Sequence, residues 1–77
     1  MNNFNVVLSE IKQHCKEVNV PSHECFERVR AVLEEQDQSC FDFYLDFLQD
    51  LGLIKYNGNN KFIVLTERGK FTEQLFN

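Results

Sequence analysis

Several features that mark common functional classes are missing from this chain of 77 residues. It has three cysteines but no Cys-x-x-Cys pair, and no paired ligand spacing typical of a structural zinc site. Its three glycines, Gly52, Gly58 and Gly69, stand apart at positions where turns or helix caps use glycine. The sequence therefore gives no indication of a zinc finger or of a glycine-rich loop that binds phosphate.

Long apolar stretches are also missing. No segment approaches the roughly 20 apolar residues that span a bilayer. The first ten residues, MNNFNVVLSE, lack the basic region and the apolar core of a signal peptide. Cys15, Cys25 and Cys40 cannot all pair within one chain, which favours a reducing environment. We therefore expect a cytoplasmic protein without a membrane anchor.

The short chain predicts a single domain, 1–77, with a small core. A protein of this size buries about 60% of the surface that its unfolded chain exposes. Eight phenylalanines are many for such a core, so we expect some aromatic surface to stay exposed or to be covered by a partner. Residues 1–50 carry four basic and ten acidic side chains, and residues 51–77 carry four basic and two acidic ones.

Two amphipathic helices are predicted in the first half of the chain. Asn3 can cap the first, and Pro21 should end it, because the residue before a proline avoids the helical conformation. Ser22 can cap the second, and the polar run 34–38 ends it. Apolar residues at helical spacing form the inward faces: Phe4, Val7, Leu8, Ile11, Cys15 and Val18 in the first helix, and Phe26, Val29, Val32 and Leu33 in the second.

A third helix is predicted from a capping-box pattern at Ser39 and Asp42 to a stop at Gly52. The connection from the second helix is short enough for a helix-turn-helix. One apolar stripe recurs at three- and four-residue steps along the third helix: Phe41, Tyr44, Leu45, Leu48 and Leu51.

A β-hairpin follows the third helix. Leu53–Tyr56 and Lys61–Leu65 are rich in β-branched and aromatic residues. Asn57-Gly58 is a strong signal for a type I′ turn, although the two asparagines after it leave the turn length open. Thr66 can cap a short last helix. The apolar residues after it are expected to fold back onto the core: Phe71, Leu75 and Phe76.

The outline L-G-L-I, a polar turn, and F-I-V-L-T-E-R-G resembles the third helix and wing of a winged helix-turn-helix domain. The resemblance covers most of the chain up to Gly69. It implies an α+β fold with three helices, a two-stranded antiparallel wing and a short C-terminal helix. It also implies DNA binding, with the third helix in the major groove and the wing at the DNA backbone.

The third helix departs from the DNA-binding pattern in its charge. Asp42, Asp46 and Asp50 form one acidic row, and no Lys or Arg on this helix offsets their repulsion from phosphates. Exposed aromatic residues mark protein interfaces, and Phe43 and Phe47 lie off the inward stripe, near Cys40. These two rings either pack against the first or last helix or form an interface, for which a homodimer is the simplest case.

DNA contact remains the alternative. Gln49 on the third helix can contact a base, and the hairpin and the segment after it carry Lys55, Lys61, Arg68 and Lys70. The lysines of the hairpin can neutralise phosphates, but lysines on an exposed hairpin also prevent edge-to-edge pairing.

No catalytic constellation is predicted. His14-Cys15 and His23-x-Cys25 bring thiols and imidazoles close in sequence, but both cysteines also fit apolar helix faces. We expect no enzyme activity, metal, cofactor or small-molecule substrate. The sequence favours a non-catalytic regulatory module that binds another protein or a second copy of itself, with DNA binding as the alternative.

Overall fold

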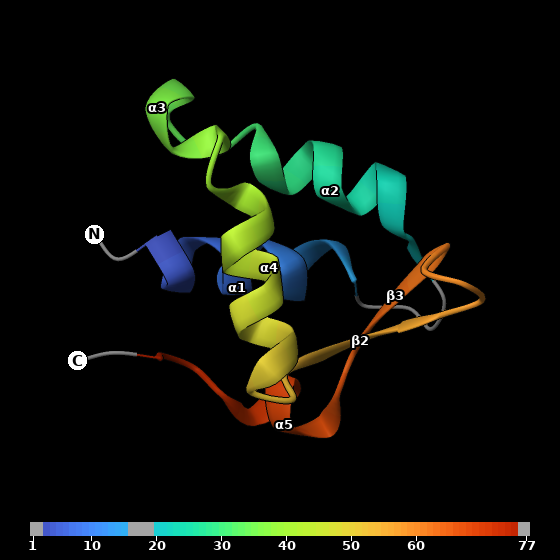
Figure 1. Ribbon diagram of the computed structural model, residues 1–77. Helices are drawn as coiled ribbons and strands as arrows, with labels where there is room; N and C mark the ends of the chain where they lie inside the picture. Colours follow the sequence, from blue (N-terminus) through green and yellow to red (C-terminus); the bar gives the residue numbers. More distant parts are fainter. Residues whose placement is uncertain (1–2, 16–19, 76–77) are drawn as a thin grey trace.

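The computed structural model describes residues 3–15 and 20–75. This part of the chain is α+β, with five helices and three short strands (Figure 1). In chain order the elements are α1 (Asn3–His14), β1 (Val20–Pro21), α2 (Ser22–Arg30), α3 (Glu35–Gln38), α4 (Phe41–Asp50), β2 (Ile54–Asn57), β3 (Phe62–Leu65) and α5 (Glu67–Phe71).

The helices surround the core, and the hairpin extends to one side. α1 packs against both α2 and α4, and α5 packs against β3 below them (Figure 1). The tip of the hairpin comes close to the start of α2, where the Ser22 backbone N–H donates to the Lys61 carbonyl at 2.9 Å. Residues 20–22 therefore tie the hairpin to the helical body.

The sheet has a strand that the sequence did not predict. Its three antiparallel strands lie in the order β1-β3-β2, and Val20 and Pro21 of β1 pair with Ile63 and Phe62 of β3. The prediction that the first helix runs up to Pro21 is wrong, since α1 ends at His14. Proline favours an extended residue before it and fits at a sheet edge, where its missing N–H is tolerated.

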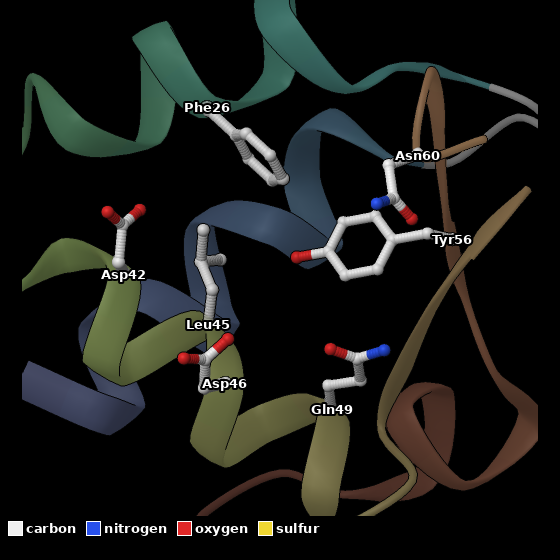
Figure 2. A pocket seen from close by; sticks show the side chains of 7 residues that line it. All are labelled: Phe26, Asp42, Leu45, Asp46, Gln49, Tyr56 and Asn60. Atoms are coloured by element: carbon white, nitrogen blue, oxygen red, sulfur yellow. The ribbon is translucent and has the colours of Figure 1, made fainter.

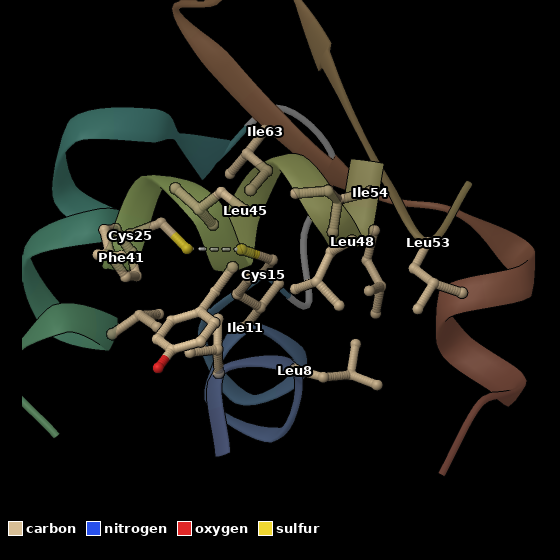
Figure 3. Close-up of a cluster of buried hydrophobic side chains, with 14 of the residues drawn as sticks. Leu8, Ile11, Cys15, Cys25, Phe41, Leu45, Leu48, Leu53, Ile54 and Ile63 are labelled. Carbon is tan, nitrogen blue, oxygen red and sulfur yellow. Dashed lines mark hydrogen bonds between the residues drawn. The ribbon is translucent and has the colours of Figure 1, made fainter. Parts of the chain in front are cut away.

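The predicted apolar stripes of α1 and α4 form the core. Leu8 and Ile11 of α1 lie in one buried cluster with Leu45 and Leu48 of α4, and both strands of the hairpin complete it (Figure 3). Val7 of α1 belongs to the same cluster. Other expected core residues do not contribute fully. Phe4 and Phe26 are only half-buried, Val32 is exposed, and Val18 lies outside the described residues.

Two predicted stop and cap positions are confirmed at the junction of α4 and the hairpin. Gly52 has a φ of +75° and ends α4. Thr66 caps α5: its Oγ1 accepts from the Gly69 N–H at 3.0 Å and its hydroxyl donates to the Gly52 carbonyl at 2.6 Å. One threonine side chain thus joins the end of α4 to the start of α5.

Three other predicted caps are wrong. Ser39 follows the unpredicted short helix α3, and its hydroxyl donates back to the Gln36 carbonyl at 3.4 Å, so α4 begins after Cys40 without a side-chain cap. Ser22 is a buried first residue of α2, and Pro21 occupies the cap position. Asn3 likewise lies inside α1 and donates from Nδ2 to the Tyr44 hydroxyl at 3.1 Å.

The hairpin turn lies two residues further on than predicted. Asn57 pairs with Phe62, which leaves Asn59 and Asn60 as the central turn residues, with φ of 57° and 68°. The Lys61 N–H donates to the carbonyl of residue 58 at 3.2 Å and closes the turn. Two positive φ angles in succession are typical of type I′.

The segment after α5 folds back only in part. Leu75 packs against the core, and its N–H donates to the Asn5 side chain at 2.6 Å. Phe71, in contrast, is 81% exposed, so its expected burial is wrong. Phe76 lies outside the described residues.

Candidate functional site

α4 positions the candidate site residues on two sides of its buried stripe. Phe43 and Phe47 lie on the side toward α1, where both contact Phe4. Asp42 and Asp46 lie on the side toward α2 and the hairpin. The period of the helix separates the two groups, because residues four apart share a face.

The first group belongs to an aromatic cluster made of Phe4, Phe43, Tyr44 and Phe47. The Phe4 ring centroid lies 4.6 Å from that of Phe47, 5.0 Å from that of Tyr44 and 5.8 Å from that of Phe43. These separations are typical of attractive aromatic pairs. Phe47 is half-buried in the cluster, whereas Phe43 is 60% exposed. The two rings therefore differ: Phe47 contributes to packing and Phe43 is largely available to a partner.

The second group lines an open pocket of about 460 Å³ between α2, α4 and the hairpin (Figure 2). This volume falls within the range of ligand-binding pockets, about 300–1,000 Å³. We call it the α4–hairpin pocket. Its lining residues are Phe26, Asp42, Leu45, Asp46, Gln49, Tyr56 and Asn60.

Two aromatic rings form one wall of the α4–hairpin pocket. The rings of Phe26 and Tyr56 meet edge to face with centroids 6.0 Å apart, and Phe41 supports Phe26 from the core at 5.8 Å. Tyr56 alternates with Lys55 along β2, so its side chain turns toward the body of the protein. Its hydroxyl points into the pocket, toward α4 (Figure 2).

Two carboxylates give the α4–hairpin pocket its charge. Asp42 and Asp46 are exposed, one helical turn apart, and neither forms an ion pair within residues 3–15 and 20–75. The pKa of Tyr56 is raised to about 12, first by burial and then by the negative charges of Asp46 and Asp42. Tyr56 therefore stays protonated at neutral pH and can donate a hydrogen bond.

The titration of Tyr56 tests this electrostatic arrangement. In a Tyr44→Phe variant only Tyr56 contributes a tyrosinate signal, and its absorbance should change with a midpoint near pH 12. Because the pKa is higher in the folded than in the unfolded state, the stabilisation is complete below pH 10 and is lost as the pH rises toward 12. A further Asp46→Asn substitution should lower the midpoint. A midpoint equal to that of the urea-unfolded chain would contradict the arrangement.

The remaining sequence candidates do not join this pocket, apart from Gln49. Asp50 is exposed at the end of α4, and Lys55 and Lys61 are exposed on the hairpin. Arg68 and Lys70 are exposed on α5, where Lys70 Nζ lies 3.5 Å from a Glu67 carboxylate oxygen. α4 itself carries no basic residue to balance its aspartates.

The histidines and cysteines form no metal or catalytic cluster in the described ranges. His14 pairs with Glu10 at 3.4 Å and His23 with Glu27 at 3.3 Å, each on its own helix. No group of three or more His, Cys, Asp or Glu side chains there could hold a metal ion. The imidazoles are thus paired with carboxylates and not with the neighbouring thiols.

The thiols of Cys15 and Cys25 meet each other in the core. Their Sγ atoms lie 2.8 Å apart and share a hydrogen bond (Figure 3). This bond and burial raise the pKa of Cys15, while the bond from Cys15 and the nearby Arg28 lower the pKa of Cys25. Both side chains are almost fully buried, which keeps them from reacting with substrates, whereas Cys40 is exposed.

The sequence did not predict four lining residues of the pocket and one aromatic partner. Phe26 and Leu45 were assigned to the inward faces of their helices, and Tyr56 and Asn60 were considered only as parts of the hairpin. Phe4 was assigned to the inward face of the first helix. Strand alternation was the one available signal, since it places Tyr56 on the same face as buried Ile54.

No known protein family, curated protein or solved structure matches this chain. Among the described residues no helix is long and apolar enough to cross a membrane.

Proposed function

We propose that this protein is a non-catalytic interaction module of the winged-helix type that binds another protein through α4 and the hairpin. The order of the elements supports the winged-helix proposal: α4 ends at Gly52 and is followed directly by an antiparallel hairpin. The free cysteines fit a reducing compartment such as the cytoplasm.

The charge of α4 is the observation that carries this proposal. Its outward side presents Asp42, Asp46 and Asp50 without a single basic residue on the helix. Each carboxylate placed beside a DNA phosphate would be repelled, and no released counterion would compensate. The same side attracts a positively charged protein segment, because complementary charges favour association.

Phe43 supports the same conclusion from the other side of α4. An aromatic ring that is 60% exposed, with its cluster behind it, supplies the kind of anchor that protein interfaces use. The simplest partner for this surface is a second copy of the chain, since a symmetric dimer needs only one complementary patch.

DNA binding is the second candidate, supported by the exposed side chains of Lys55 and Lys61 on the hairpin. These two residues alone would contact few phosphates, and the resulting DNA affinity would fall strongly with salt. The mild basic character of residues 51–77 also favours this alternative.

A pair of substitutions tests the role of the aromatic cluster. Phe43→Asp should leave a folded monomer at concentrations where the parent protein associates, because the exposed ring carries the interface. Phe47→Asp should instead lower the stability of the fold by about 1–3 kcal/mol, since it places a carboxylate against the ring of Phe4.

Sedimentation velocity with labelled duplex DNA at low salt distinguishes the partner classes in one experiment. We expect the sedimentation coefficient of the protein to rise with its concentration. The sedimentation coefficient of the DNA should stay the same when protein is added. Circular dichroism of both variants shows whether they fold. A parent protein that stays monomeric and raises the sedimentation coefficient of the DNA would favour the DNA alternative.

A further inference from the structure

The α4–hairpin pocket combines groups of two kinds that no other described pocket joins. One wall is aromatic, from Phe26 and Tyr56, and the opposite wall carries the carboxylates of Asp42 and Asp46 (Figure 2). The second described pocket lies between α1 and the loop after α2 and contains no aromatic ring. The α4–hairpin pocket therefore has lining groups that restrict both the shape and the charge of a ligand.

The polar groups of the pocket have no partners within the described residues. Within residues 3–15 and 20–75 the Asp42 and Asp46 carboxylates accept no hydrogen bond, and neither the Tyr56 hydroxyl nor the side-chain amides of Gln49 and Asn60 form one. Their acceptor capacity is thus unused. A ligand that donates several hydrogen bonds and carries positive charge would match them.

The geometry of the walls further restricts the chemical class of the ligand. A planar cation can stack on an aromatic face while its edge donates to carboxylates and amide oxygens. The guanidinium of arginine has five N–H donors in one plane and meets carboxylates in pairs of parallel bonds. A lysine ammonium fits the charge but offers no plane to stack, and an anion would meet two negative charges.

The residues of the pocket are held in place by the fold. Asp42, Asp46 and Gln49 lie on one long helix, and Tyr56 is fixed by the pairing of β2 with β3. Asn60 occupies a turn position with a positive φ and lines the pocket from the hairpin turn. The backbone positions of these residues are therefore set before a ligand binds, and only side-chain rotamers remain to be ordered.

We propose that the α4–hairpin pocket binds an arginine side chain presented by the partner protein. The guanidinium stacks on the aromatic wall that the touching rings of Phe26 and Tyr56 form, and it donates to Asp42 and Asp46. This inference rests on the proposed function and names the chemistry that the partner must present. The excess of ten acidic over four basic residues in 1–50 attracts the same kind of basic segment over a longer range.

A peptide titration tests the pocket directly. Isotope-labelled protein is titrated with a capped, flexible heptapeptide that carries one arginine among glycines and serines, and its amide signals are followed by NMR. The arginine peptide should shift the amides of Gln49, Tyr56 and Asn60. The same peptide with citrulline, which keeps the plane but lacks the charge, should shift none of them, and a lysine peptide should bind more weakly.

Matched variants separate the pocket from general charge. Asp42→Asn and Asp46→Asn should each weaken the affinity for the arginine peptide by about fivefold to tenfold. Asp50→Asn removes the same charge from the same helix outside the pocket and should change the affinity by less than about twofold. Phe26→Leu keeps an apolar side chain but removes the ring. It should weaken the binding of the arginine peptide more than that of the lysine peptide.

Four results would overturn the inference. Equal binding of the arginine and citrulline peptides would remove the role of charge. Equal losses for Asp46→Asn and Asp50→Asn would show nonspecific attraction by the acidic surface. Shifts confined to Phe43 and the aromatic cluster would contradict binding in the pocket but would agree with the proposed protein-binding function. Salt-dependent binding of duplex DNA would contradict both.

Discussion

Replacing Gly69 by alanine should lower the free energy of unfolding by about 1–3 kcal/mol, although the change adds a single methyl group. A Cβ at this position would collide with the Leu53 carbonyl oxygen and would lie 2.7 Å from Cδ1 of Leu65. The carbonyl cannot move away freely, because it accepts the Thr66 N–H at 3.0 Å. The substitution therefore pushes α5 away from the junction that Thr66 caps.

Urea unfolding followed by circular dichroism measures this cost. Lys70→Ala, at the exposed neighbouring position, is the matched control and should change stability by less than about 0.5 kcal/mol. Gly52→Ala gives a useful contrast: its added Cβ meets no atom within 4 Å, but its φ of +75° should still cost about 1–2 kcal/mol. A Gly69→Ala variant as stable as the parent would show that α5 does not pack as described.

Truncation of Leu48 to alanine should cost even more, about 2–5 kcal/mol. Leu48 is fully buried on α4, in the cluster where α1 and the hairpin meet. A domain of this size has a total stability of roughly 0.05–0.15 kcal/mol per residue, so the loss removes a large share of it. The variant should unfold at a much lower temperature and be partly unfolded at 37 °C.

The control for Leu48→Ala is Val32→Ala. Val32 was expected in the core, but it is 46% exposed in the turn after α2. Its truncation should therefore cost less than about 0.5 kcal/mol. Thermal unfolding of both variants checks the pair, and similar losses would contradict the description of the core.

Local signals in the sequence predicted the elements that depend on near neighbours. The stripe from Phe41 to Leu51 predicted α4, and Gly52 and Thr66 marked the end of α4 and the start of α5. Each of these signals acts within one helical turn, through the period of the apolar face or through a cap. The structure confirms them for that reason.

Features that depend on distant partners were missed. Val20 becomes a strand residue only because it pairs with Ile63, which lies far along the chain. The turn lies at Asn59-Asn60 because Asn57 pairs with Phe62, although Asn57-Gly58 has the stronger local signal. Sheet register is decided by burial across the whole sheet and not by turn residues alone.

The candidate site divides in the same way. The acidic row of α4 and the off-stripe rings could be predicted from helical spacing, and Asp42, Asp46 and Gln49 do line one pocket. The concave shape could not be predicted, because Phe26 comes from α2, before α4 in the chain, and Tyr56 from β2, after it, and the two rings meet only in the folded protein. The difference between half-buried Phe47 and exposed Phe43 likewise depends on where α1 crosses α4.

The central claim is that the surface of α4 and the hairpin binds a basic protein segment and not DNA. The most direct measurement is a parallel NMR titration of the labelled protein with an arginine-bearing peptide and with mixed-sequence duplex DNA, each at low and at higher salt. The account predicts shifts at Asp46, Gln49 and Tyr56 with the peptide and none with DNA. Salt-dependent shifts at Lys55, Lys61 and α4 with DNA, and none with the peptide, would contradict it.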